Sequence, residues 1–412
     1  MALNIVWIAF FLIAFAIALI KLVFFGDVEI FKKLADGIFD SAKSSVMDVA
    51  LPLAGTMVFF LGLMNIAEKA GAIRFLARYL NPFMKRIFPE VPDGHPAMGQ
   101  MVMNFSANML GLDNAATPFG LKAMESLQSL NPDKDKATNA QIMFLVLHTS
   151  GLTLIPLSII AYRISTNSAQ PAAIFIPCVL GTLMTTLASI VVVGIWQRLR
   201  WDMVLIGGLL GTIAAIGLMM FYVNSLDAAQ KEVFSKVVGN LLLFVLVVLI
   251  IVGGVWKKVN VFDAFIEGAK GGFDVVLKII PYLVGMLVAI RVFRDSGALG
   301  YVTDGMAWLI QAMGFNTDFV PALPVAIMKP FSGSGARGMM LDVFKNPALG
   351  PDSFPGLAAS IFQGSADTTF YIIALYFGSV GIKKVRYAIW AGLIADIIGV
   401  IAAVFIAYIF FH

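Results

Sequence analysis

The chain has 412 residues, of which 59% are hydrophobic and 13% are charged, whereas an ordinary soluble domain carries about 25% charged residues. This composition excludes a typical soluble protein and predicts a chain that folds in lipid. The formal net charge of +4 is small and spread over loops, which favours anchoring at the cytoplasmic face of a membrane over nucleic-acid binding. Because Cys178 is the single cysteine, disulfides within the chain are excluded as well.

Long apolar segments recur along the sequence, each of about 20 residues, the length that crosses the ~30 Å hydrocarbon core of a bilayer. The first lacks a basic start and a cleavage site, so we expect a retained helix and not a signal peptide. The predicted fold class is an all-α polytopic membrane protein with about nine to eleven transmembrane helices, broken or re-entrant segments and amphipathic interfacial helices. The predicted spans are Leu3–Phe25, Val46–Ile66, Ala140–Tyr162, Ala172–Ile195, Met203–Val223, Val238–Trp256, Asp274–Phe293, Ile361–Val380 and Ala388–Phe411.

The order of sequence features in the first half is repeated in the second. Asp40-Ser41-Ala42-Lys43 precedes an apolar segment with Pro52, and Glu267-Gly268-Ala269-Lys270 precedes one with Pro281. Internal repeats decide the architecture. We therefore predict a first module over residues 1–200, a joining transmembrane helix within 201–230 and a second module over 231–412.

Two modules with a binding site at their interface are the usual plan of secondary transporters, and interrupted apolar segments in matching positions indicate the site. The basic pairs Lys32-Lys33 and Lys257-Lys258 stand at equivalent places in the two modules. By the positive-inside rule these pairs favour parallel modules. The later cations Lys383, Lys384 and Arg386 have no equally basic counterpart, so the orientation stays open.

The first interrupted segment contains three amides and a proline in an apolar neighbourhood. Asn104 and Asn108 are four residues apart and share one face of a helix. Asn114, Thr117 and Pro118 indicate where that helix breaks or a second half-helix is capped. An unsatisfied polar group in hydrocarbon costs several kcal/mol, so these side chains must face protein, water or a ligand. The alternative is that they hydrogen-bond neighbouring helices.

The second interrupted segment, Lys329–Gly338, falls opposite the first in the repeat register. Its glycines, prolines and the hydroxyls of Ser332 and Ser334 predict a broken helix with free backbone groups that bind an anion or a polar solute. Lys329 and Arg337 add charge at a depth where charge is costly and usually functional. The alternative is an interfacial loop whose cations reach lipid headgroups. A Gly-x-Gly-x-x-Gly pattern is present, but a dinucleotide site requires a preceding strand.

A third pair of matching segments contains His148 in the first module and Gln363, Ser365, Asp367 and Thr368 in the second. Asp367 and Thr368 are suited to capping the following helix, whose positive end favours a carboxylate or phosphate. Asp367 is equally suited to a proton or a cation. A buried histidine titrates near neutral pH and suits proton coupling, although a structural role is an equal alternative.

The sequence contains no Ser, His and Asp arrangement in a plausible scaffold, no His-rich metal motif and no Walker-type phosphate loop. We therefore predict that the protein is not an enzyme, and we identify no catalytic residue, metal ligand or cofactor. Isolated charges in or near the spans, among them Arg291 and Asp396, are ordinary near helix ends and receive no ligand role. A basic stretch between Lys69 and Ile87 predicts an amphipathic helix on an anionic leaflet.

These same residues carry a resemblance to a known family. The first half resembles bacterial spore maturation protein A through Asn114-Ala115-Ala116-Thr117-Pro118-Phe119-Gly120, and the second resembles spore maturation protein B through Gly350-Pro351-Asp352-Ser353-Phe354 and Tyr376-Phe377-Gly378-Ser379. Both halves are similar to the gate, or nucleoside-recognition, module of concentrative nucleoside transporters and of the ferrous-iron transport protein B. The resemblance implies a transporter-type protein of the bacterial plasma (inner) membrane, associated in spore formers with spore core dehydration. The nucleoside transporters' modules are inverted, which opposes the parallel arrangement favoured by charge.

The leading hypothesis is a secondary transporter or permease whose path runs between the modules, for a small anionic, zwitterionic or nucleoside-like solute. Arg337 and the helix start at Thr368 favour an anionic or zwitterionic one. The predicted substrate-binding residues are Asn104, Asn108, Asn114, Thr117, His148, Ser332, Ser334, Arg337, Gln363, Ser365, Asp367 and Thr368.

The competing hypothesis is a non-transporting membrane scaffold or lipid-interacting assembly linked to envelope or spore maturation. A membrane-embedded enzyme that uses Asp367 and His148 is a distant third. The expected partners are the lipid bilayer and a small polar solute, with no nucleic acid, and a homo-oligomer is compatible with the sequence.

Overall fold

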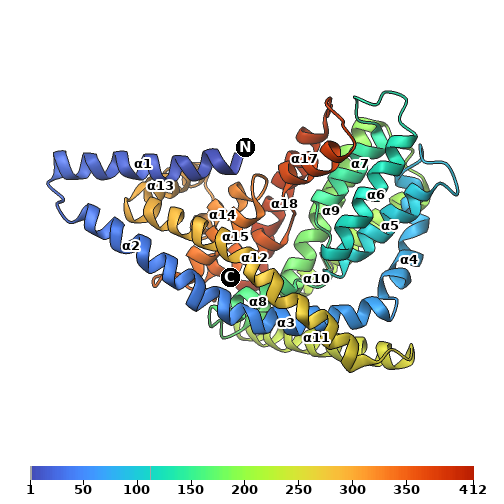
Figure 1. The fold of residues 1–412 in the computed structure, drawn as a ribbon, viewed down its shortest axis with the longest axis horizontal. Coiled ribbons are helices and arrows are strands. Elements are labelled where there is room, and N and C mark those ends of the chain that lie inside the picture. The colour runs from blue at the N-terminus through green and yellow to red at the C-terminus, as the bar shows by residue number, and fades with distance from the viewer. Residues whose placement is uncertain (1, 112) are drawn as a thin grey trace. The chain divides into compact units, whose positions relative to one another are not determined.

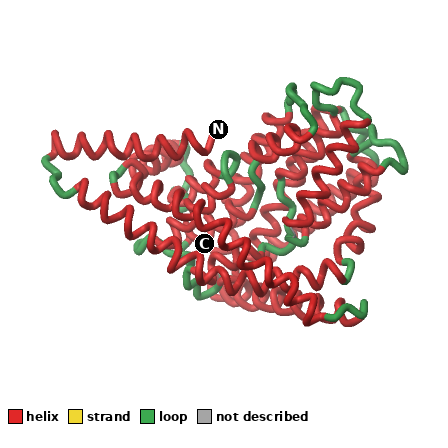
Figure 2. The backbone as a smooth tube through the Cα atoms, in the orientation of Figure 1, coloured by secondary structure: helices red, strands yellow, loops and turns green. Residues whose placement is uncertain are grey.

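The computed structural model describes residues 2–111 and 113–412, and every named element in that part of the chain is helical (Figure 1, Figure 2). The prediction of an all-α polytopic membrane protein is confirmed. Within the described residues, seven helical segments are long and apolar enough to cross a membrane. They are Asn4–Phe25, Ile30–Lys69, Pro171–Gln197, Met203–Asn224, Ala229–Trp256, Val261–Asp295 and Ala388–Phe411.

Two of the predicted spans, Ala140–Tyr162 and Ile361–Val380, are wrong as continuous helices, because each is broken near its middle. The first consists of α7 (Asn139–Thr149) and α8 (Leu157–Ser165), and the second contains α17 (Thr369–Ser379) and the end of α16 (Phe354–Gly364). In the first, the chain leaves the helix at Gly151, whose φ is +61°, a conformation that glycine adopts without steric cost. These two segments are the ones that fall opposite each other in the sequence repeat.

The chain packs as two compact units, each assembled from three stretches of sequence. Unit 1 contains Met1–Leu61, Ser158–Pro171 and Ala269–Gln363, and unit 2 contains Gly62–Leu157, Ala172–Gly268 and Gly364–His412. Each unit therefore takes residues from both predicted modules. The chain also passes from one unit to the other at both helix breaks.

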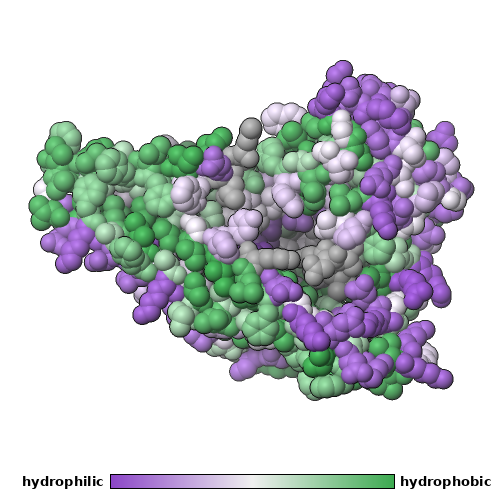
Figure 3. Space-filling view, in the orientation of Figure 1, coloured by the Kyte–Doolittle hydropathy of each residue, from purple (hydrophilic) through white to green (hydrophobic). Residues whose placement is uncertain are grey.

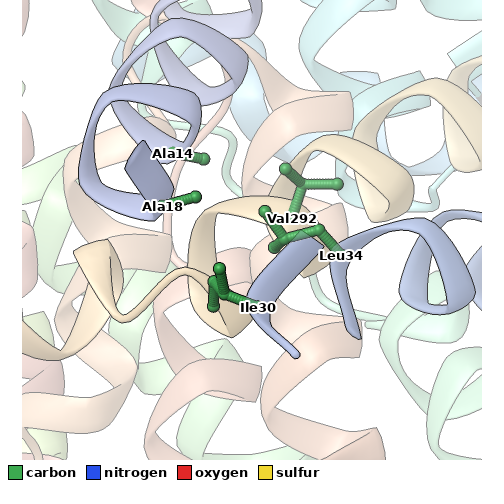
Figure 4. Packing of buried hydrophobic residues seen from close by; sticks show 5 residues of the cluster. All are labelled: Ala14, Ala18, Ile30, Leu34 and Val292. Atoms are coloured by element: carbon green, nitrogen blue, oxygen red, sulfur yellow. The ribbon is translucent and has the colours of Figure 1, made fainter. Parts of the chain in front are cut away.

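In unit 1, α1 (Ala2–Phe25) and α2 (Ile30–Ser44) follow each other as a helical hairpin that packs on α12 (Val261–Asp295). The small side chains of Ala14 and Ala18 on α1 make room for Ile30 and Leu34 on α2 and for Val292 on α12 (Figure 4). Burial of each larger side chain stabilises the packing by about 1.5–3 kcal/mol. The other faces of α1 expose large apolar side chains (Figure 3), as a lipid-facing helix does; examples are Leu12, Phe15, Val23 and Phe24.

Unit 1 also contains α13 (Ala298–Ala312), η3 (Val320–Ala322), α14 (Leu323–Met328) and α15 (Gly333–Lys345). The predicted interruption at Lys329–Gly338 is shorter than expected, because the glycines from Gly333 onward are helical. Ser332 ends the interruption with extended backbone, and its Oγ accepts a hydrogen bond from the Gly335 amide at 2.9 Å. This N-cap starts α15 despite the low helix propensity of glycine.

In unit 2, α5 (Pro96–Met109) and α6 (Asp113–Ser129) pack against each other as a helical hairpin. The turn between them includes Gly111, whose φ is +70°. The predicted helix break at Asn114, Thr117 and Pro118 is therefore wrong by several residues, since α6 already begins at Asp113 and Pro118 lies within it. The broken-helix character of this segment is nevertheless observed.

Two further predicted helices also lie in unit 2. The basic amphipathic stretch is α4 (Ala72–Ile87), and the joining helix is α10 (Met203–Asn224). Asp202 caps α10 by accepting a hydrogen bond from the Leu205 amide at 2.8 Å, and it pairs with Arg86 of α4 at 2.7 Å. The Leu205 amide, then the Arg86 guanidinium, hold the pKa of the Asp202 carboxyl below its usual value. Because the folded-state pKa is lowered, this cap stabilises α10 above the ordinary carboxyl range and is lost on acidification.

Unit 2 also contains α7, α17, α9 (Phe175–Gln197), α11 (Ala228–Trp256) and α18 (Ala388–Phe411). The short η2 at Pro171–Ile174 precedes α9 and begins at the boundary with unit 1. Helices α9 and α18 make close contact at Gly399, where a Cβ atom would lie 2.3 Å from Thr185 Oγ1 and 3.2 Å from Thr185 Cβ. Because threonine is β-branched and stiff, it has little freedom to move aside.

Gly399→Ala is therefore expected to destabilise the protein by about 1–3 kcal/mol, measured as a lower thermal unfolding midpoint in detergent. Gly217→Ala in α10 is the matched control, because no atom lies within 4 Å of its added methyl group. It should be neutral or mildly stabilising. Equal midpoints for the two variants would show that α9 and α18 do not pack at Gly399.

Candidate functional site

The predicted site residues are divided between the two units. Unit 2 contains Asn104, Asn108, Thr117, His148, Ser365, Asp367 and Thr368, and unit 1 contains Ser332, Ser334, Arg337 and Gln363. The side chain of Asn114 lies outside the described residues. Each unit has its own polar cluster, and each is described separately.

Asn104, Asn108, His148 and Tyr376 form the amide–imidazole cluster of unit 2. His148 Nδ1 lies 2.9 Å from Asn104 Oδ1 and 3.1 Å from Asn108 Nδ2, so the shared helix face predicted for the two asparagines is directed at the histidine. Asn104 is fully buried and His148 is 5% exposed, whereas Asn108 is half-buried. Asn108 is therefore the most exposed member of the cluster.

Asn104 and Asn108 both contact Nδ1 of His148, and the two contacts require opposite roles of that nitrogen. Asn104 Nδ2 donates to the Ala116 carbonyl at 2.7 Å, which fixes its Oδ1 toward the imidazole. A proton on Nδ1 donates to Asn104 Oδ1 and leaves Nε2 as an acceptor, whereas a hydrogen bond from Asn108 Nδ2 needs an unprotonated Nδ1. Tyr376 Oη lies 3.5 Å from Nε2, at the outer limit for a hydrogen bond.

Tyr376 was missed by the sequence prediction. It is fully buried in α17, and its ring stands edge-on to His148 with the ring centroids 5.0 Å apart. Gly120 of α6 leaves the space for its hydroxyl group, because a Cβ atom there would lie 2.3 Å from Tyr376 Oη. A tyrosine in an apolar helix has no sequence signal of its own. Its partnership with a histidine 228 positions away is visible only in the structure.

The two helix breaks meet at a backbone crossing in unit 2, formed by Thr149–Gly151 and Ala366–Asp367. The Asp367 amide, just before α17, donates to the Thr149 carbonyl at the end of α7 at 2.7 Å. At the same place Gly151 approaches the backbone so closely that a Cβ atom would lie 3.0 Å from the Ala366 carbonyl carbon and from the Asp367 nitrogen. The carbonyl end of one half-helix thus adjoins the amide end of another, an arrangement that provides partial charges of both signs for a polar solute.

Gly151→Ala tests this crossing. The added methyl group strains the positive φ and presses on backbone that cannot rotate away, so we expect a loss of about 1–3 kcal/mol of stability. Gly99→Ala in α5 is the control, because its methyl group meets no atom within 4 Å. Thermal unfolding in detergent compares the two, and unchanged stability of the Gly151 variant would contradict the observed contact.

Hydroxyl groups of α9 hold the unwound segment after α7. Thr182 Oγ1 donates to the Thr153 carbonyl at 3.2 Å, and Ser150 Oγ lies 2.9 Å from Thr186 Oγ1. The Leu154 amide donates to the Met109 carbonyl at the end of α5 at 2.8 Å. Irregular backbone in a membrane protein requires such partners. Specific hydrogen bonds therefore stabilise the unwound segment.

The predicted capping roles after the second break are partly wrong. Thr368 stands at the N-cap of α17 but makes no side-chain cap. Asp367 Oδ1 instead accepts a hydrogen bond from the Thr368 amide at 2.7 Å, and the carboxylate interacts electrostatically with His148 and Tyr376. Asp367 therefore links the crossing of the two breaks to the amide–imidazole cluster.

Thr369, the first residue of α17, binds an acidic side chain of α18. Its hydroxyl donates to Asp396 Oδ2 at 2.6 Å, and Asp396 is 7% exposed in the middle of α18. The interpretation of Asp396 as an ordinary charge near a helix end is wrong. An acidic side chain inside a long apolar helix is itself a functional signal, and that signal was available in the sequence.

In unit 1 the hairpin cluster consists of Lys329, Ser332, Ser334, Arg337 and Gln363. Lys329 is 9% exposed, and its Nζ donates to the Gln363 carbonyl at 2.8 Å, at the end of α16. A cation at this place stabilises the negative end of the half-helix. The alternative of a lysine that reaches lipid headgroups is therefore wrong. Ser334 Oγ lies 3.1 Å from the capping Ser332 Oγ.

Arg337 lies with its guanidinium carbon 5.2 Å from the ring centre of Tyr162, a cation–π contact. Among the described residues, no carboxylate pairs with it within 4.0 Å. Its Nε and the Oε1 of Gln363 are buried there without a hydrogen-bond partner. Buried polar atoms of this kind are rare and suggest a partner such as water or an ion.

Arg163 is the second residue that the sequence prediction missed. It is fully buried, and it donates to the Pro351 carbonyl at 2.6 Å, to Asp352 Oδ1 at 2.7 Å and to Ser168 Oγ at 3.0 Å. Asp352 also accepts from Ser168 Oγ and from the Ala169 amide. With this many bonds inside unit 1, Arg163 is a structural residue and not a ligand for a solute.

Comparisons with known proteins place this arrangement in a family. The Gate family, described as nucleoside recognition, matches residues 50–166 and 276–383, which include both helix breaks. Spore maturation protein B of Bacillus subtilis (strain 168) is 47% identical over 162 residues, 39% of this chain and 88% of that protein. Spore maturation protein A of the same strain is 36% identical over 189 residues, 46% of this chain and 92% of that protein. The resemblance noted from the sequence is confirmed, and the chain belongs to the Gate nucleoside-recognition family of membrane proteins.

Proposed function

We propose that the protein is a solute permease of the bacterial plasma membrane that binds a small polar solute at the crossing of its two helix breaks. The observation that carries this proposal is the hydrogen bond between the Thr149 carbonyl and the Asp367 amide, next to the amide–imidazole cluster. Broken helices that supply both dipole ends to one place are how secondary transporters hold polar solutes inside a membrane.

The polar groups at the crossing of the two helix breaks favour a solute with both hydrogen-bond donors and acceptors. Asn108 offers an amide, Asp367 a carboxylate and the start of α17 backbone N–H groups. Zwitterionic and nucleoside-like solutes have this mixture of groups. The description of the family as nucleoside recognition agrees with the second class. In this proposal the protein is not an enzyme, and its partners are lipid and the solute.

Uptake into proteoliposomes tests the proposal. The probes are radiolabelled uridine, glycine and glutamate, which represent the nucleoside-like, zwitterionic and anionic classes. We expect accumulation of at least one of them above that in protein-free liposomes, with competition by the same unlabelled compound. Absence of uptake of all three in both membrane orientations would overturn the proposal.

A membrane scaffold is the second candidate, since Asn104 already bonds protein groups on two sides. Asn108→Ala separates the two candidates. If Asn108 only joins helices, its loss lowers the thermal unfolding midpoint. If it binds a solute, the variant is as stable as the original or more so, while uptake falls.

A further inference from the structure

Unit 1 contains a cavity of about 450 Å³ that takes no part in the proposed permease site. Sites for small molecules occupy about 300–1,000 Å³. The cavity lies between α2 with the following η1 (Ser45–Ala50), the turn after α8, α12 and α15. Most of its wall is charged or hydroxylated, which is unusual in a chain with this apolar composition. The lining includes Asp40, Asp48, Asn167, Arg291, Arg294 and Lys345.

Two rare backbone conformations line this cavity. Residues Ser45–Ala50 form a π-helix between α2 and α3 (Leu51–Lys69), and such turns are frequent at functional sites. Asn167 has a φ of +58°, which few residues other than glycine adopt. Unusual backbone of this kind persists where function requires it.

The π-helix has a direct effect on the wall of the cavity. Asp40 and Asp48 are eight residues apart and would differ by about 80° around a regular α-helix, at about 100° per residue. The wider π turn rotates the chain less for each residue and brings the two carboxylates closer to one face. Both residues line the cavity. Among the described residues, neither forms a hydrogen bond through its side chain or an ion pair within 4.0 Å.

The basic side chains of the cavity come from α12 and α15. Arg294 pairs with Asp342 at 2.5 Å, and Arg291 pairs with Asp295 at 2.5 Å. Lys345 Nζ donates to the Ser44 carbonyl at 3.2 Å, and the carboxylates of Asp48 and Asp342 attract its charge. The Arg291 side chain keeps 37% of its surface exposed. The cavity thus presents exposed carboxylates on α2–η1 and cations on α12 and α15.

We propose that this cavity binds a small zwitterionic solute, with its ammonium group toward Asp40 and Asp48 and its acidic group toward Arg291 and Lys345. A solute of one charge would satisfy only one set of side chains, whereas a dipolar solute satisfies both. Asp40 and Asp48 are both exposed, so their carboxylates are accessible to an entering solute. Binding in this cavity involves unit 1 alone and does not depend on transport by the protein.

Binding to the purified full chain in lipid nanodiscs tests this proposal by isothermal titration. The probes are glycine, β-alanine and γ-aminobutyrate, whose charges are increasingly far apart, with ethylammonium and acetate as single-charge controls. We expect saturable binding of at least one zwitterion and weaker binding of both single-charge compounds. The double variant Asp40→Asn/Asp48→Asn should bind the zwitterion about three- to tenfold more weakly.

Asp36→Asn is the matched control, because Asp36 is an exposed acid of the same helix outside the cavity lining. It should bind the zwitterion like the original protein. Because the permease site is itself proposed to take zwitterions, the same titrations are repeated in an Asp367→Asn background, where the binding that remains is that of this cavity. Failure of every zwitterion to bind, or equal affinity in the double variant and the Asp36 control, would overturn the proposal.

Discussion

Arg163→Met is expected to destabilise the protein by about 1–3 kcal/mol, the cost of leaving buried hydrogen-bond partners unsatisfied. The Arg163 side chain is fully buried, while Asp352 keeps 40% of its surface exposed. The substitution removes the bonds to the Pro351 carbonyl, Asp352 and Ser168 together. The measurement is the thermal unfolding midpoint of detergent-solubilised protein.

Lys33→Met is the control for Arg163→Met, because Lys33 is exposed on α2 and its replacement should change stability little. Asp352→Asn should cost less than Arg163→Met, since the amide still accepts a hydrogen bond and the residue is partly exposed. A midpoint for Arg163→Met within the range of the Lys33 control would contradict the role of Arg163 as the main polar contact of unit 1.

Asp367→Asn is expected to reduce uptake about tenfold or more while the fold is retained. The asparagine keeps an oxygen that accepts the Thr368 amide, and the backbone bond to Thr149 does not involve the side chain. The substitution removes only the negative charge near His148 and the solute. A charged hydrogen bond contributes about 1.5–3 kcal/mol, which sets the size of the expected effect.

Asp135→Asn is the control for Asp367→Asn, because Asp135 forms a surface ion pair with Lys383 at 3.2 Å in the same unit. Surface pairs contribute about 0–1 kcal/mol, so uptake should be preserved. Equal uptake by the Asp367 and Asp135 variants would remove the Asp367 carboxylate from the solute site.

Much of the fold follows from hydrophobicity alone. The long apolar segments correspond to helices because lipid leaves the backbone no other partner than itself. The two exceptions, α7–α8 and α16–α17, are broken by polar and glycine positions of only a few residues, such as Gly151 and Ala366-Asp367. A hydropathy pattern averages over such short interruptions. The repeat itself indicated which segments were special, since these two fall opposite each other.

The candidate site was predicted in part. Amides and charges in apolar sequence predicted Asn104, Asn108, His148 and Asp367, because their presence in a membrane protein requires partners. Tyr376 and the hydroxyls of α9 could not be predicted in this way, since they gain their roles from contacts between distant segments. The compact units also combine residues from both halves of the sequence. No local pattern encodes that assembly.

The central claim is that water and a polar solute reach the amide–imidazole cluster, and substituted-cysteine labelling tests it most directly. Cys178 is buried and is the single cysteine, so a Cys178→Ala background allows one thiol to be introduced at a time. With a membrane-impermeant methanethiosulfonate applied to both sides of the membrane, we expect labelling of Asn108→Cys. We expect no labelling of Leu249→Cys, which lies on the exposed apolar surface of α11. An Asn108→Cys variant as unreactive as Leu249→Cys would contradict the account.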